Sequence, residues 1–283
     1  FSPDGQLIVT ANEGEPNDEY TVDPEGSISI IEVSKGFAVQ TLGFQSFESQ
    51  KASLMDQGLR VFGPNATFSQ DLEPEYVTID ASSSVAWVTL QENNGIARVD
   101  LKRKEITDIF PMGLKDNLMA GNELDVSDRD GISGNLQNWP LMSYFLPDAI
   151  GSFQVGGNTF LITANEGDTR DYDGFGEESR VKDLALDPTA FPNASELQKD
   201  QNLGRYTVTT SSGDLDGDGD FDVLFGIGTR SFSIWNGRNG ALVRDYTDLE
   251  RDLLMANASL YDDGRSDNKG VEPEGIEIGQ IRV

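Results

Sequence analysis

A run of alternating aspartates gives the strongest metal-binding signal in this 283-residue chain. Ca²⁺ prefers about six to eight oxygen ligands in a flexible geometry, and the spacing matches the first half of an EF-hand loop. Phe225 stands where the closing glutamate belongs, so we expect a Ca²⁺ loop of another kind, with the alternative of an acidic turn without metal. Without a cation, so many close carboxylates repel one another strongly. The expected ligands are Asp214, Asp216, Asp218, Asp220 and Asp222.

A second group of acidic residues follows from two recurring phrases. Thr-Ala-Asn-Glu-Gly occurs at 10–14 and 163–167, with a looser copy, Thr-Leu-Gln-Glu, at 89–92. Glu-Pro-Glu occurs at 73–75 and 272–274, with a weaker version at 147–148. The first phrase closes an apolar run and the second opens one, so antiparallel pairing brings both phrases to one end of a sheet. We expect a rim of carboxylates that binds cations; the alternative is that each acid caps a turn and faces water. The rim candidates are Glu13, Glu73, Glu92, Asp148, Glu166 and Glu272.

Two arginines lie among these acids. Arg170 follows Asn165-Glu166-Gly167-Asp168, and Arg230 lies in a turn where other repeats place Glu. The planar guanidinium fork suits phosphate or carboxylate groups. Arg170, Arg230 and Glu166 are therefore catalytic candidates if the rim holds an anionic substrate, and plain ion pairing with neighbouring acids is the alternative.

The amino-acid composition limits the kinds of catalytic and metal-binding site that the chain can form. The chain holds 49 Asp and Glu against 21 Lys and Arg, a formal charge of −28, and has no Cys and no His. Disulfides, thiolate zinc sites, Cys nucleophiles and Ser-His-Asp triads are therefore excluded. Such an acidic surface repels nucleic acids, so we expect none as a partner. Calcium is the expected cofactor, although acidity serves solubility alone in many proteins.

The elements that position these residues are predicted to be strands. Residues 76–80, 85–91, 96–101 and 105–111 are rich in β-formers and are separated by turns, including Asn94-Gly95. Residues 27–33 and 37–43 resemble the last two of these strands, and 221–228, 231–235 and 241–246 resemble the last three. Four-stranded antiparallel units of about 40 residues are typical of β-propeller blades. We expect an all-β propeller with roughly four blades; a β-sandwich of hairpins is the alternative.

Three stretches interrupt the pattern. We expect insertions at about 45–72, 114–145 and 188–201, the last with one short helix at 195–199 capped by Asn193 or Ser195. The aspartate run is expected at the opposite end of the blades from the rim. A further strand is expected just before Val283. Propellers usually need more than the roughly four blades counted here to close, so residues 1–283 are expected to form a single, incomplete propeller domain. No apolar run reaches the roughly 18 residues of a membrane span.

Several of these motifs together resemble the choice-of-anchor I family over essentially the whole chain. They include Asn165–Phe175, Arg180–Leu184, the aspartate run, Arg230–Trp235 and Asp267–Gly275. The resemblance implies a secreted, periplasmic or surface-anchored bacterial β-propeller. Relatives in the family include a mesenchyme-specific cell-surface glycoprotein and bacterial proteins named atypical alkaline phosphatase.

Two functions follow, and a protein-binding scaffold with no ion function is a third alternative. The first is a calcium-binding extracellular propeller with a structural or adhesive role, whose partners are calcium ions and extracellular surface components. The alternative is a Ca²⁺-dependent phosphomonoesterase, in which rim carboxylates hold the cations, Arg170 and Arg230 bind the phosphate ester, and water attacks.

Overall fold

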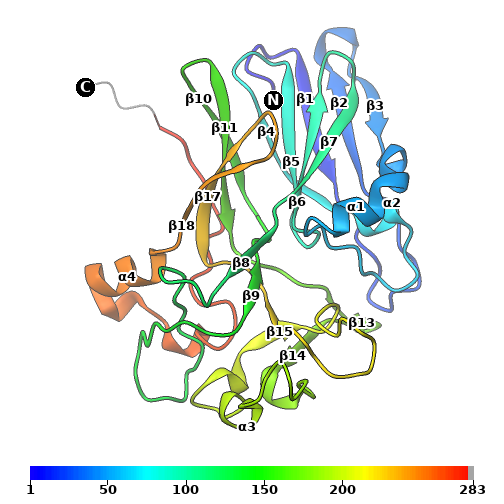
Figure 1. Cartoon of the computed structure of the whole chain (residues 1–283). Helices are drawn as coiled ribbons and strands as arrows, with labels where there is room; N and C mark the ends of the chain where they lie inside the picture. Colours follow the sequence, from blue (N-terminus) through cyan, green and yellow to red (C-terminus); the bar gives the residue numbers. More distant parts are fainter. Residues whose placement is uncertain (280–283) are drawn as a thin grey trace.

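Three antiparallel sheets stand side by side in the computed structural model, which describes residues 1–279 (Figure 1). In each sheet the strands lie side by side in the order in which they occur along the chain, and all neighbouring strands are antiparallel. The first contains β1 (Leu7–Asn12), β2 (Ser27–Glu32) and β3 (Ala38–Leu42). The second contains β4 (Pro74–Ile79), β5 (Val85–Leu90), β6 (Gly95–Asp100) and β7 (Glu105–Pro111). The third contains β10 (Ile150–Val155), β11 (Asn158–Asn165), β17 (Ser231–Asn236) and β18 (Leu242–Tyr246).

The middle sheet is buried on both faces, and β5 shows why. Side chains alternate between the two faces of a strand. Val88 and Leu90 of β5 pack with Ile28 and Ile30 of the first sheet, whereas Trp87 packs with Leu161 and Trp235 of the third. A strand with two buried faces needs an almost continuous apolar sequence, and the sequence from Val85 to Leu90 meets that requirement.

The predicted strands of the second sheet are confirmed, as are β2 and β3. The prediction for the last unit is wrong in one respect: residues 221–228 do not supply the strand beside 231–235. That place is taken by β11, which pairs with β17 from Asn165–Ser231 to Phe160–Asn236. Residues 166–230 therefore form a long excursion between two neighbouring strands.

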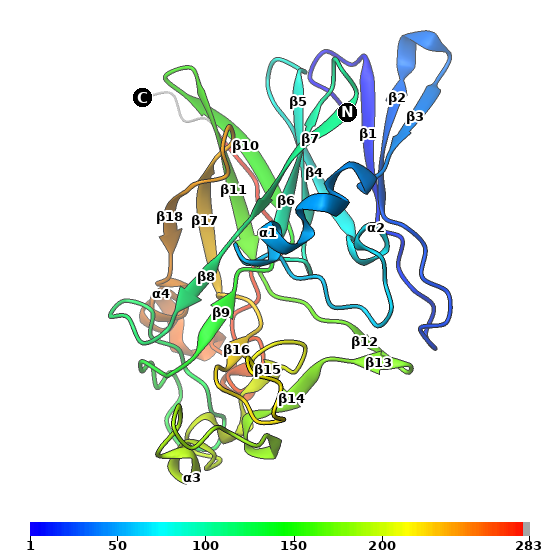
Figure 2. The ribbon, with the colours of Figure 1, turned by 45° about the vertical axis from the view of Figure 1, so that its right-hand side comes forward.

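The excursion and the segment 114–144 together build a separate, irregular layer below the three sheets (Figure 2). Its sheet has the order β14-β15-β16-β9-β8, and β16 and β9 are parallel. The strands are β8 (Leu114–Asp116), β9 (Met142–Tyr144), β14 (Glu178–Arg180), β15 (Thr207–Thr209) and β16 (Phe225–Gly226), with a hairpin of β12 (Asp171–Tyr172) and β13 (Phe175–Gly176) nearby.

The structure has more helix than expected. α3 (Ala194–Leu197) lies where one short helix was predicted, with Asn193 at its N-cap position. α1 (Lys51–Met55) and α2 (Phe68–Asp71) lie in the first insertion, and α4 (Leu249–Asn257) follows β18. Short 3-10 helices span Val33–Lys35, Gln45–Gln50, Val181–Asp183, Leu203–Arg205, Ala258–Leu260 and Asp263–Arg265.

Blade-like sheets number three within residues 1–279, rather than the four expected. Residues 207–209 belong to the lower sheet and to no blade-like unit. The strand expected at the end of the chain falls partly on residues 280–283, outside the described residues. Residues up to 279 that precede it form no regular strand, and Ile278 lies against Gly151 of β10.

Candidate metal centre

The three sheets deliver carboxylates to one end of the molecule. Glu13 follows the end of β1, Glu73 precedes the start of β4, and Glu92 follows the end of β5. Glu166 follows the end of β11 in the same way. Because neighbouring strands run antiparallel, these starts and ends meet at the same edge.

A repeated hydrogen-bond network explains the Thr-x-Asn part of the repeated phrase. In the third sheet, Thr163 Oγ1 donates to Asn165 Oδ1 at 2.8 Å, and Asn165 Nδ2 donates to Ser231 Oγ at 3.0 Å and Ser233 Oγ at 2.7 Å. The first sheet repeats this arrangement with Thr10, Asn12, Ser27 and Ser29. The network locks the end of one strand to its neighbour and so fixes where the following glutamate leaves the sheet.

The glycine of the same phrase is required by close backbone contact. Gly167 has a φ of +94°, and a Cβ there would lie 2.6 Å from the Cα atom of Gly228. A larger residue would push apart the two segments that enter and leave the excursion.

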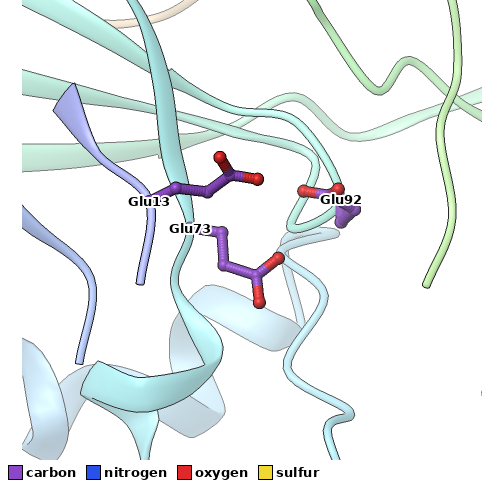
Figure 3. Close-up of side chains that lie close together, drawn as sticks. All are labelled: Glu13, Glu73 and Glu92. Atoms are coloured by element: carbon purple, nitrogen blue, oxygen red, sulfur yellow. The ribbon is translucent and has the colours of Figure 1, made fainter. Parts of the chain in front are cut away.

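Three glutamates turn their carboxylates toward a common space (Figure 3). Glu13, Glu73 and Glu92 each offer an oxygen, and these oxygens lie within 4.8 Å of one another. Glu73 is 0 % exposed and Glu92 is 7 % exposed. Glu73 Oε1, Glu75 Oε2 and Glu92 Oε2 are buried oxygens without a hydrogen-bond donor. Buried acceptors are rarely left without a partner, so a proton or a cation between these carboxylates would satisfy their oxygens.

Burial disfavours the charged form of each buried carboxyl. It raises the pKa of Glu92 to about 7, and nearby Glu13 and Asp168 add to the effect. Burial also raises the pKa values of Glu73 and Glu75 well above their usual range, with Glu92 contributing further repulsion. At neutral pH, therefore, these carboxyls ionise only against a substantial electrostatic cost.

Arg170 supplies one fixed positive charge beside the three glutamates. Its guanidinium is fully buried: Nη1 lies 2.6 Å from Asp71 Oδ1 and Nη2 lies 3.1 Å from Glu73 Oε1. It also lies over the ring of Phe62, 4.6 Å from the centroid. Arg170 favours ionisation of Glu73 and Glu92, but it shares its single charge with Asp71.

Two other predicted rim residues, Asp148 and Glu166, also lie close to these negative charges. Asp148 and Glu166 each have a raised pKa, first because of burial and then because of neighbouring acids that include Asp168. Gln91 donates to Glu166 Oε2 at 3.1 Å and ties the second sheet to the third. Lys269 Nζ lies 2.6 Å from Asp168 Oδ1 and partly offsets the charge. We call the gathered residues the acidic cluster: Glu13, Glu73, Glu75, Glu92, Asp148, Glu166 and Asp168.

Glu272 does not join the acidic cluster. It forms an ion pair with Arg265, with Nη2 2.6 Å from Oε1. The charge of Glu274, two residues later, instead raises the pKa of Asp148. The Glu-Pro-Glu phrase at 272–274 therefore does place a glutamate near the acidic cluster, but this residue is Glu274 and not Glu272.

Neither arginine proposed for substrate binding presents a free guanidinium. Arg230 is 1 % exposed, and its Nη1 donates to Asp125 O at 2.6 Å and to Glu250 Oε1 at 2.8 Å. Its Nη2 donates to the carbonyls of Ser266 and Asn268. Arg230 therefore ties α4 to the lower layer, and binding of a phosphate ester by either arginine stays a prediction that no contact favours.

The aspartate run forms an exposed loop in the excursion, and its carboxylates divide into two groups. Oxygens of Asp214, Asp216 and Asp218 lie within 4.8 Å of one another, and so do oxygens of Asp220, Asp222 and Asp187. The excursion leaves and rejoins the third sheet at Asn165 and Ser231, beside the acidic cluster. The expectation that the loop lies at the opposite end of the sheets is therefore wrong.

Sequence reasoning missed the partners that approach from distant segments. Asp187 reaches the aspartate loop through the parallel bridge between Leu186 and Phe221. Arg60 forms a buried ion pair with Glu177 next to Arg170. For Asp71, its position two residues before Glu73 was the one feature of the sequence that could have indicated a place near the three glutamates.

Comparison with known proteins decides the family. The model of the choice-of-anchor I domain matches residues 1–282. The chain belongs to this family. Over 107 residues it is 42 % identical to the mesenchyme-specific cell surface glycoprotein of Strongylocentrotus purpuratus. The match covers 37 % of this chain and 13 % of that protein, so the chain spans only a small part of the relative.

Solved structures give weaker likenesses. The hydrazine synthase of Kuenenia stuttgartiensis has a TM-score of 0.30 and 13 % identity, covering 87 % of this chain and 47 % of that one. The Cps50 (Swd1) β-propeller domain of Myceliophteria thermophila has a TM-score of 0.23 and 9 % identity, covering 87 % and 72 %. Within residues 1–279, none of the helices has the length and apolar character needed to cross a membrane.

Proposed function

We propose that this choice-of-anchor I chain is a surface-associated β-propeller domain whose sheets are joined at one end by a bound Ca²⁺ ion. The observation that carries the proposal is the convergence of Glu13, Glu73 and Glu92, in which Glu92 Oε2 is buried without a hydrogen-bond donor and Glu73 has only the shared charge of Arg170 as a partner. These three residues come from two different sheets, so a shared cation would hold the sheets together.

Calcium fits this donor set better than other common metals. All donors are carboxylate oxygens, and the chain has no Cys or His to favour zinc or copper. Mg²⁺ demands a strict octahedron and keeps several waters, whereas Ca²⁺ accepts many carboxylates in irregular arrangements. The seven acids of the acidic cluster suit the larger ion.

The surface role is supported by the family and by the name of the sea-urchin relative, a cell surface glycoprotein. The propeller architecture is supported by the three antiparallel sheets packed side by side. Bound calcium would make the end of the sheets at the acidic cluster rigid, and the extracellular medium would supply the ion.

Titration calorimetry with CaCl2 tests the proposal. We expect the wild type to bind Ca²⁺ with release of protons, because binding ionises carboxyls whose pKa values burial has raised. Glu73→Gln should weaken one binding event. Glu48→Gln, an exposed glutamate in the 3-10 helix Gln45–Gln50, serves as the matched control. Equal calcium binding by all three proteins would contradict the proposal.

The exposed aspartate loop needs its own control. A double variant, Asp214→Asn with Asp216→Asn, removes two carboxylates of one loop group. If calcium binding disappears in this variant and survives in Glu73→Gln, the ion belongs to the loop, and the proposed joining of the sheets fails.

A further inference from the structure

A polar cleft of about 590 Å³ lies at the other end of the sheets from the acidic cluster. It is lined by the turn after β4, by β5 and β6, and by the turns of the third sheet: residues 80, 85, 87, 98, 157–159 and 236–239. β4, β5 and β11 each have one end at this cleft and the other at the acidic cluster. The volume falls within the usual range of small-ligand sites.

Several acceptors in this lining, those of Asp80, Asn236 and Asn239, are already used by the protein itself. Asp80 Oδ1 accepts from the backbone N–H groups of Ser84 at 2.7 Å and Val85 at 2.9 Å. Asn236 Oδ1 accepts from the N–H of Arg238 at 2.9 Å, and Asn239 Oδ1 accepts from the N–H of Ala241 at 3.2 Å. These bonds also fix the turns that shape the cleft.

The donors, by contrast, remain available. The amide nitrogens of Asn236 and Asn239 and the guanidinium of Arg238 make no hydrogen bond within the described residues. Arg98 uses Nη1 on Thr107 and Asp108, but its buried Nε has no partner. Arg238 forms no ion pair within residues 1–279, in a chain of formal charge −28.

We infer that this cleft binds an anionic saccharide through its carboxylate or sulfate groups. A donor-rich lining selects a ligand that is rich in acceptors, and Arg238 favours negative charge, whereas the charge of Arg98 is already paired with Asp108. Several side-chain amides suit the ring and hydroxyl oxygens of a sugar. The cleft is too polar for an apolar ligand, and the indole Nε1 of Trp87 is already committed to Gly237 O at 2.9 Å. Binding here is independent of the proposed calcium site.

Calorimetry with three tetrasaccharides tests the inference, in buffer with saturating CaCl2. Hyaluronan supplies carboxylates, sulfated dextran supplies sulfates, and maltotetraose is neutral. We expect at least one anionic ligand to bind, more weakly as salt rises, and at least tenfold more weakly to Arg238→Gln. Arg244→Gln on the exposed face of β18 is the matched control and should bind like the wild type.

A further variant separates the cleft from the calcium site. Glu92→Gln should bind the saccharide as the wild type does, because Glu92 lies at the far end of β5. Saccharide binding at this cleft is refuted if maltotetraose binds as tightly as the anionic ligands, or if none of the three binds at millimolar concentration. It is also refuted if Arg238→Gln and Arg98→Gln bind like the wild type. Thermal melting shows whether both variants are folded.

Discussion

Replacing Glu92 by Gln should stabilise the protein without calcium and weaken its stabilisation by calcium. Gln keeps the shape of the side chain and removes the charge. Burial raises the pKa of Glu92 from its ordinary 4.5 to about 7. Since one pKa unit corresponds to about 1.4 kcal/mol, keeping Glu92 ionised at pH 8 costs the metal-free fold about 3 kcal/mol.

The same charge is needed when the ion is present. A ligand at 100 times its dissociation constant adds about 2.7 kcal/mol to stability, and Glu92→Gln should lose much of that gain. For a chain of this size, about 1 kcal/mol corresponds to roughly 2–4 °C in melting temperature. The variant should therefore melt several degrees above the wild type in EGTA, and this difference should largely disappear in CaCl2.

Differential scanning fluorimetry at pH 8, with EGTA or with CaCl2, provides the readout. Glu48→Gln should follow the wild type in both buffers. If Glu92→Gln melts below the wild type in EGTA, or keeps its full advantage in CaCl2, the argument from the buried, unpartnered oxygen of Glu92 is refuted.

Three other outcomes are expected. In EGTA, the unfolding free energy of the wild type should fall as pH rises from 5 to 9, because carboxyls with raised native pKa values, Glu92 first, must give up protons. In CaCl2 this fall should be much smaller. Denaturant titrations at several pH values measure both. Asn165→Ala should lower stability by about 2–3 kcal/mol by removing two buried hydrogen bonds to serines, and an unchanged urea midpoint would contradict the role of the network. Arg170→Met should cost about 3–5 kcal/mol, because it leaves Asp71 buried beside Glu73 without a cation; a loss below about 1 kcal/mol in urea would show that Arg170 is not needed there.

The local parts of the fold could be predicted from sequence. The strands of the second sheet follow from short β-rich runs and an Asn-Gly turn. The meeting of Glu13, Glu73 and Glu92 follows from the repeated phrases and the antiparallel pairing that they imply. In each case the signal lies within a few tens of residues.

What the sequence could not supply depends on contacts between distant segments. β11 pairs with β17 across 65 intervening residues, and the nearby run 221–228 offered an equally apolar partner. The locations of Arg170 and Arg230 depend on Asp71 and Glu250, which approach from other layers. Glu272 and Glu274 share one phrase, and only the packing of Arg265 decides which of them is withdrawn from the acidic cluster.

A crystal structure grown with CaCl2, with anomalous differences measured at long wavelength, would show directly whether a calcium ion joins the sheets. We expect an anomalous peak between Glu13, Glu73 and Glu92, with carboxylate oxygens at about 2.3–2.6 Å from the ion. A clear map with no peak there, or with calcium only among the aspartates of 214–222, would contradict this expectation.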